Sequence, residues 1–139
     1  TKGHRHQPEI TQELNSLSNN KIKVLFTPHL VSMTRGILGT NYATLKNDIN
    51  ENDVIELYKE FYKNEPFIKI VTAPPATKHT WGSNFVYLYP YIRKDTNTLV
   101  VISALDNLVK GSAGAAIQNM NLMQGFEETM GIGALPVYP

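Results

Sequence analysis

Leu105-Asp106-Asn107-Leu108-Val109-Lys110-Gly111-Ser112-Ala113-Gly114-Ala115-Ala116-Ile117-Gln118-Asn119-Met120-Asn121-Leu122-Met123 reads as a strand end that turns into a helix. The aliphatic run from Val100 to Leu105 predicts a buried strand, and Asp106, Asn107 and Gly111 favour a turn and a helix start. The small side chains that follow would let another protein surface or a ligand approach closely. The free N–H groups of such a helix start also suit a phosphate or a carboxylate.

Two amide side chains on this predicted helix share one face. Gln118 and Asn121 are three residues apart, opposite the more apolar Ile117, Met120 and Met123. This spacing predicts a helix face that meets a polar partner. The alternative is a tightly packed helix whose polar residues simply face outward, because short Gly/Ala patterns are common.

Composition narrows the class of protein. A chain of 139 residues is one ordinary domain, and 42% hydrophobic with 18% charged residues are globular values. Because 13 basic residues face 12 acidic ones, no global field favours nucleic acid or a membrane surface, and we expect a soluble protein. The absence of cysteine excludes disulfides and a cysteine nucleophile within this chain. Since the start is polar and lacks Met and a signal pattern, we expect a piece of a longer protein.

Three ionisable groups stand at the first predicted helix. His4 and His6 precede it and Glu9 lies on its first turn, where an extended backbone would direct both imidazoles to one side. Histidine titrates near neutrality, so an acid–base role fits this position. A metal site built from the two imidazoles and the carboxylate is an alternative, and a solvated polar turn is another.

The remaining pattern predicts an α+β fold. We expect a helix from Pro8 to about Asn19, strands over 21–27, 35–45, 67–72, 85–93 and 99–105, and helices over 53–62 and after Gly111. The turn residues 94–97 predict an antiparallel hairpin, and hence a mixed, largely antiparallel sheet covered by helices. Arg35 begins a strand, where its guanidinium could hold a carboxylate or phosphate through two hydrogen bonds.

Five blocks of the chain together resemble one enzyme family. They are Gly3-His4-Arg5-His6-Gln7-Pro8-Glu9-Ile10, Phe26-Thr27-Pro28-His29-Leu30, Thr34-Arg35-Gly36-Ile37, Lys78 with Gly82-Ser83-Asn84, and Asp106-Asn107-Leu108 through Gln118-Asn119-Met120-Asn121. In this order and at these separations they resemble the C-terminal part of N-acetyl-gamma-glutamyl-phosphate reductases. Ser32, Trp81 and Ser112 depart from residues usual in that family, and Trp81 affects the expected shape of its loop.

The resemblance implies a fold and an activity. The fold would resemble the C-terminal domains of glyceraldehyde-3-phosphate and aspartate-semialdehyde dehydrogenases, with residues 1–139 as one substrate and oligomerisation domain. The nucleotide-binding Rossmann domain and the cysteine nucleophile would lie outside this chain. The enzyme would be a cytoplasmic, homo-oligomeric oxidoreductase of arginine biosynthesis that reduces an acyl phosphate with NADPH, and this chain alone would be inactive.

The resemblance also implies roles for particular residues. His4 is the predicted catalytic group, His6, Glu9 and Arg35 are the predicted substrate-binding residues, and Gly114, Gln118 and Asn121 are the predicted cofactor contacts. No metal is expected, and NADP would bind mainly to the other domain. The partners expected are the small acyl-phosphate substrate and further copies of the chain, with no nucleic acid or membrane. The alternative functions are a non-catalytic oligomerisation or interaction domain of this fold and a metal-dependent hydrolase.

Overall fold

The computed structural model describes residues 3–137. These divide into two compact units, one up to Ser32 and one from Met33 onward, and each is described by itself. The first holds helix α1 (His6–Ser16), and the second holds the β-sheet and the other helices. Within the described residues, no helix is both long enough and apolar enough to cross a membrane.

The first unit is α1 with an extended segment against it. Pro8 lies in the first turn as predicted, but the helix ends at Ser16 rather than near Asn19. The predicted strand over 21–27 is wrong, because this segment pairs with no strand in the described chain. Its backbone is instead bonded by side chains of α1: Gln7 Nε2 donates to the Val24 carbonyl (3.3 Å), and Asn15 Oδ1 accepts from the Ile22 N–H (2.6 Å). Ile22, Val24 and Phe26 are partly buried and the residues between them are exposed, so burial alternates as in a strand although no strand pairing is formed.

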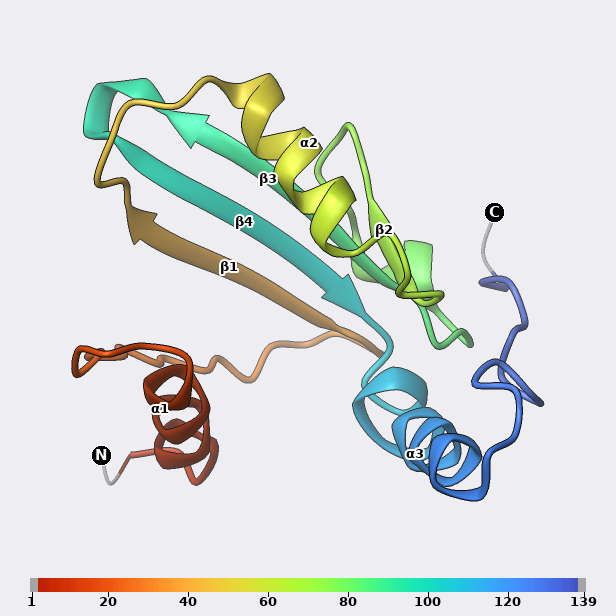
Figure 1. The fold of residues 1–139 in the computed structure, drawn as a ribbon. Coiled ribbons are helices and arrows are strands. Elements are labelled where there is room, and N and C mark those ends of the chain that lie inside the picture. The colour runs from red at the N-terminus through yellow and green to blue at the C-terminus, as the bar shows by residue number, and fades with distance from the viewer. Residues whose placement is uncertain (1–2, 138–139) are drawn as a thin grey trace. The chain divides into compact units, whose positions relative to one another are not determined.

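A four-stranded sheet organises the second unit, in the order β1-β4-β3-β2 (Figure 1). The strands are β1 (Ile37–Thr44), β2 (Ile68–Ile70), β3 (Val86–Arg93) and β4 (Thr98–Leu105). β4 pairs antiparallel with β1 and β3, whereas β2 is parallel to β3. The predicted hairpin is confirmed, since a 3-10 turn over Lys94–Thr96 and the left-handed Asn97 join β3 to β4.

Helix α2 (Glu51–Phe61) crosses one face of the sheet over β3 and β2 (Figure 1). Asn50 caps it by accepting a hydrogen bond from the Asp53 N–H. Val54 of α2 and the alternate β3 residues Val86, Leu88 and Pro90 are buried. We assign these β3 residues to the covered face, because Tyr87, Tyr89 and Tyr91 between them are only partly buried. The α+β class and the mixed sheet are thus confirmed, although α2 is the helix that lies on it.

Helix α3 (Gly114–Gln124) follows β4 through a π-helical turn, Val109–Ala113, and ends at the left-handed Gly125. Gly114 and Asn121 are its buried residues, and Gln118 is partly buried, whereas the polar residues Asn119 and Gln124 are exposed. Its apolar residues are exposed, with Met120 50% and Met123 82% accessible. The alternative interpretation, a packed helix whose polar residues simply face outward, is wrong for Asn121, which is 1% exposed. The apolar face is the one left without a partner in the described residues.

The small residue at 114 serves close packing within the chain. A Cβ at Gly114 would clash with Asn84 Oδ1 and lie 2.8 Å from the Val109 carbonyl oxygen, whereas one at Gly111 would meet nothing nearer than 3.5 Å. Neither position has the positive φ that restricts Gly82 and Gly125. Steric contact therefore distinguishes the two glycines.

Replacing Gly114 with Ala should lower the free energy of unfolding by about 1–3 kcal/mol, because overpacking outweighs the better helix propensity of alanine. Urea unfolding of the 139-residue chain measures this. The matched Gly111→Ala variant should change it far less. Equal stability of the two variants would contradict the packing role of Gly114.

Candidate functional site

The two histidines predicted for catalysis and substrate binding lie together at the start of α1. Their ring centroids are 4.8 Å apart with an edge-on geometry, and the Phe26 ring packs edge-on against His4 at 5.5 Å. His4 Nδ1 accepts a hydrogen bond from the His6 backbone N–H at 3.2 Å. A hydrogen bond into Nδ1 places the proton of neutral His4 on Nε2, so Nε2 is the nitrogen that can donate outward.

Glu9 does not join this pair. It is exposed on the first turn of α1, and no group of three or more His, Asp or Glu side chains that could hold a metal ion occurs among residues 3–137. The metal-site interpretation of His4, His6 and Glu9 therefore gains no support from the geometry. A role for Glu9 in substrate binding stays a prediction.

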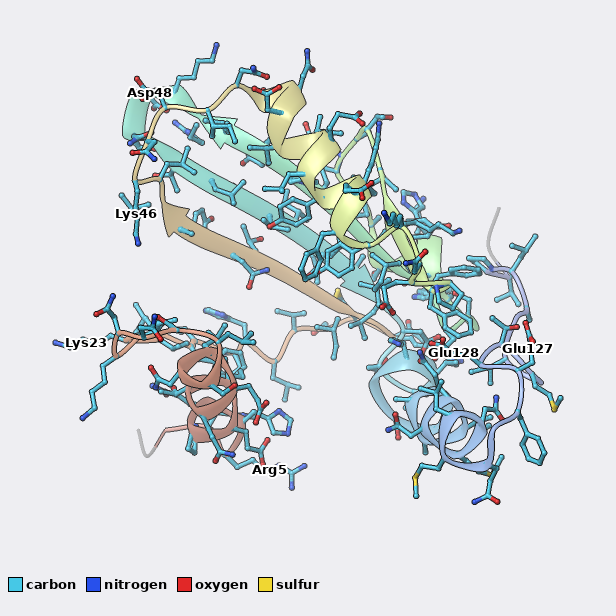
Figure 2. All side chains as sticks on the ribbon, in the orientation of Figure 1. Arg5, Lys23, Lys46, Asp48, Glu127 and Glu128 are labelled. Carbon is cyan, nitrogen blue, oxygen red and sulfur yellow. The ribbon has the colours of Figure 1, made fainter. Side chains whose placement is uncertain are left out.

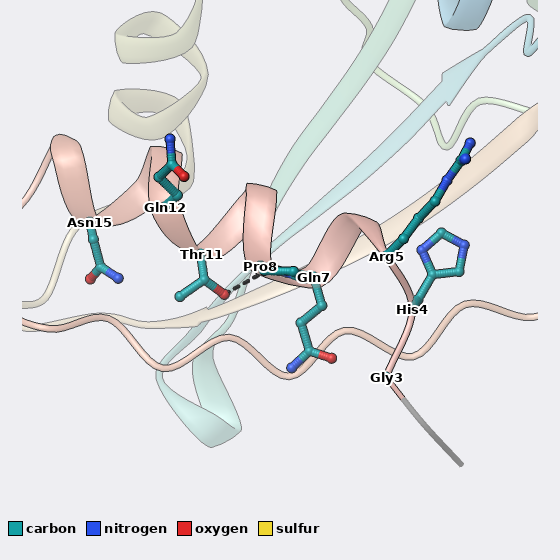
Figure 3. Close-up of a pocket in the computed structure, with 8 residues that line it drawn as sticks. All are labelled: Gly3, His4, Arg5, Gln7, Pro8, Thr11, Gln12 and Asn15. Atoms are coloured by element: carbon teal, nitrogen blue, oxygen red, sulfur yellow. Dashed lines mark hydrogen bonds between the residues drawn. The ribbon is translucent and has the colours of Figure 1, made fainter.

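An open cleft of about 640 Å³ runs along α1 from its start. It is lined by Gly3, His4, Arg5, Gln7, Pro8, Thr11, Gln12 and Asn15. Figure 3 shows His4 and Arg5 at one end of it and Asn15 at the other. The larger part of the lining surface is apolar, but it includes one cation and one imidazole, so the cleft suits a small molecule with an anionic or amide group.

Arg35 lies two residues before β1 and contacts a buried carboxylate. Its Nε is 2.6 Å from Asp106 Oδ2, an ion pair without the alignment of a hydrogen bond, and the side chain of Asp106 is fully buried. The Asp106 carboxylate also accepts the backbone N–H groups of Gly82 (2.6 Å), Leu108 (2.8 Å) and Val109 (3.1 Å). The predicted anion-binding arginine is thus held at the junction of strand, loop and helix start.

Two opposing effects set the pKa of Asp106. Burial raises it, but the Arg35 guanidinium and the three backbone N–H donors lower it by more, so that it lies below the ordinary value for an aspartate. Asp106 is then ionised in the folded state. Its stabilising contribution is fully present above the carboxyl pKa of the unfolded chain and is lost as the pH falls through the folded pKa.

The residues predicted for cofactor contact take part in a network within the chain. Gln118 accepts hydrogen bonds from Asn84 (3.0 Å) and Lys110 (2.7 Å) and donates to Glu128 (2.6 Å). Figure 2 labels Glu128 on the segment that follows α3. Burial lowers the pKa of Lys110, while the charges of Glu128 and Glu65 oppose that shift. The network therefore ties α3 to the loop before β3.

Asn121 and Gly114 are also committed to internal contacts. Asn121 is 1% exposed and donates to the carbonyls of Glu128 (3.1 Å) and Met130 (2.9 Å), and Gly114 packs against Asn84. A nicotinamide cofactor would have to displace these contacts to reach Asn121 or Gly114, so these two residues and Gln118 do not fit direct cofactor contacts here. Their assignment stays a prediction that the geometry does not favour.

The sequence-based prediction missed Asp106 and the partners of Gln118. Asp106 appeared only as a turn former, although an aspartate directly after an apolar strand and before a helix is a common capping arrangement. Asn84, Lys110 and Glu128 lie 34, 8 and 10 residues from Gln118. No local sequence pattern could have predicted that these three residues contact Gln118.

Comparisons with known proteins agree with the fold. A family model, "Semialdehyde dehydrogenase, dimerisation domain", matches residues 1–107. The chain is 51% identical over 138 residues to the N-acetyl-gamma-glutamyl-phosphate reductase of Thermoanaerobacter pseudethanolicus. It is 51% identical over 137 residues to that of Dehalococcoides mccartyi and 50% identical over 138 residues to that of Geobacter metallireducens.

In each of these three cases the match covers 98% of this chain and 40% of the relative. The chain thus spans well under half the length of the curated relatives it matches. The resemblance inferred from the sequence motifs is confirmed. With more than half of its residues matched by the family model, the chain belongs to the semialdehyde dehydrogenase dimerisation-domain family.

Proposed function

We propose that the full-length protein reduces N-acetyl-gamma-glutamyl phosphate to the semialdehyde, with NADPH as hydride donor and phosphate as the other product. The observation that carries this proposal is the His4–His6 pair at the α1 cleft, in a chain about half identical to reductases of that name. A biosynthetic enzyme of this kind would act in the cytoplasm. Residues 1–139 would form its substrate and oligomerisation domain.

Each chemical step that we propose moves a proton. A thiolate from another domain attacks the acyl phosphate and expels phosphate, leaving a thioester. NADPH, when bound, supplies the hydride that reduces it. His4 first removes the thiol proton and then donates one to the oxygen of the resulting thiohemiacetal, whose collapse releases the aldehyde and regenerates the thiol. To accept the thiol proton at Nε2, neutral His4 must carry its own proton on Nδ1, so the hydrogen bond from the His6 N–H to Nδ1 would have to open before the reaction.

Helix α3 supports a second domain in the proposed enzyme. It directs polar residues inward and leaves Ile117, Met120 and Met123 exposed, an apolar surface that a stand-alone domain would bury. A nucleotide-binding domain elsewhere in the full-length protein would cover that surface. The cysteine nucleophile and most of the cofactor site would lie on that domain, consistent with the poor fit of Gln118 and Asn121 as direct ligands.

The uncovered sheet face supports a homo-oligomer. Tyr42, Val100 and Tyr91 are in register across β1, β4 and β3, and Tyr42 is 72% exposed. A cleft of about 450 Å³ lies there, between Tyr42, Arg93 and Val100 among others. Because the matched family is a dimerisation domain, we propose that this tyrosine face, defined by Tyr42, Tyr87, Tyr89 and Tyr91, packs against a second copy.

A non-catalytic interaction domain is the second candidate. The exposed tyrosine face and α3 surface favour interaction as such. They do not explain the paired imidazoles at the α1 cleft, which a purely structural domain does not need.

Replacing His4 with Asn in the full-length enzyme should lower kcat by about two to four orders of magnitude, the usual loss for a general acid–base group. The measurement is steady-state NADPH oxidation with the acyl phosphate. The thermal midpoint should stay unchanged, because His4 is exposed. His6→Asn should act mainly on KM. Near-normal turnover of the His4 variant would remove His4 from the mechanism and indicate His6 instead.

Replacing Tyr42 with Lys should weaken self-association at least tenfold, because two buried ammonium groups at the interface would lack partners. Sedimentation of the full-length protein at micromolar concentration measures this. The matched control is Phe61→Lys, an aromatic of α2 that is equally exposed in the single chain. Dissociation by the Phe61 variant, with the Tyr42 variant still associated, would place the interface on α2.

A further inference from the structure

We propose that Asp106 is a positioning residue that aims the Arg35 guanidinium at an anionic group of the substrate. This inference deepens the proposed function and rests on it for the identity of the substrate. It concerns only the second unit, in which Arg35, Asp106 and the residues that hold them all lie.

The position of the Asp106 side chain is fixed by its contacts. It is fully buried, and each carboxylate oxygen faces two donors: Oδ1 accepts from Leu108 and Val109, and Oδ2 accepts from Gly82 and contacts Arg35. A carboxylate with four donors has no acceptor position left for a ligand. Its effect on a substrate must therefore pass through Arg35.

The backbone around Arg35 is fixed as well. The Arg35 carbonyl accepts a hydrogen bond from Trp81 Nε1 (3.2 Å), and the next residue, Gly36, donates its N–H to Asn107 Oδ1 (2.6 Å). Gly36 has a φ of +105°, and a Cβ there would lie 2.6 Å from Thr77 Cβ. These contacts fix the backbone at Arg35, and with it the direction in which the Arg35 side chain leaves the backbone.

What remains free is the outer edge of the guanidinium. Asp106 occupies the Nε side, and among residues 3–137 neither terminal nitrogen of Arg35 has a hydrogen bond or ion-pair partner. The side chain is 32% exposed. Two parallel N–H donors on this edge match the oxygen spacing of a carboxylate or a phosphate.

The ion pair with Asp106 indicates that Arg35 would bind an anion through the geometry of its guanidinium and not through its net charge. The buried Asp106 cancels most of the positive charge, so attraction at long range is weak and the directional hydrogen bonds carry the affinity. A lysine would keep the charge but lose the planar fork. This separates the proposal from a simple electrostatic role.

The test is calorimetric anion binding by the full-length protein, with inorganic phosphate and N-acetyl-L-glutamate as separate probes. Arg35→Lys and Asp106→Asn should each weaken binding of one probe about tenfold or more, and the probe affected tells whether Arg35 meets the phosphoryl or the carboxylate group. Asp95→Asn is the matched control, because Asp95 pairs with Arg93 at an exposed site. It should bind both probes as the wild type does.

A double-variant cycle tests whether Asp106 acts through Arg35. Asp106→Asn should add no further loss in an Arg35→Gln background. An undiminished loss there would overturn the proposal, as would wild-type affinity in Arg35→Lys or a wild-type protein that binds neither probe. The lysine variant decides the matter if Asp106→Asn does not fold. An inactive wild type whose anion affinity still depends on Arg35 would refute the reductase proposal alone.

Discussion

The second unit depends on one buried charge. The Asp106 carboxylate stands where β4 ends, and it would be costly to bury without partners. Three backbone N–H groups and one guanidinium compensate for that cost. The same contacts fix the start of the helical segment, the loop at Gly82 and the residue that leads into β1. The Asp106 side chain thus connects Arg35, the Gly82 loop and the helical segment to the end of the central strand β4.

Helix α3 is held to the second unit by polar contacts. Its buried side holds amides and glycine, linked through Gln118 and Asn121 to Asn84, Lys110 and the segment after the helix. Its apolar side is exposed. Hydrophobic burial normally holds an amphipathic helix to its own domain, whereas here hydrogen bonds do so. The apolar side is then available to the second domain that we propose.

Local pattern predicted the elements whose partners are near in sequence. The β3–β4 hairpin, α2 and the strand after Arg35 all follow from periodicity and turn residues. The segment 21–27 has the same alternation as a strand but lacks a partner strand, which periodicity cannot reveal. The direction of Gln118 and the role of Asp106 depend on contacts across tens of residues. The proximity of His4 and His6 was predicted, but from an extended backbone, whereas Arg5 between them has α-helical φ and ψ. The contact of Phe26 with His4 was not predicted.

We propose that this chain carries one part of an active site that another domain completes. The most direct measurement is NADPH oxidation with N-acetyl-gamma-glutamyl phosphate, compared between the full-length protein and the 139-residue chain. The account predicts turnover by the full-length protein, with one phosphate released for each NADPH oxidised, and none by the chain alone, which lacks a cysteine nucleophile. Oxidation of NADPH by the isolated chain, or a folded full-length protein inert toward this acyl phosphate, would contradict it.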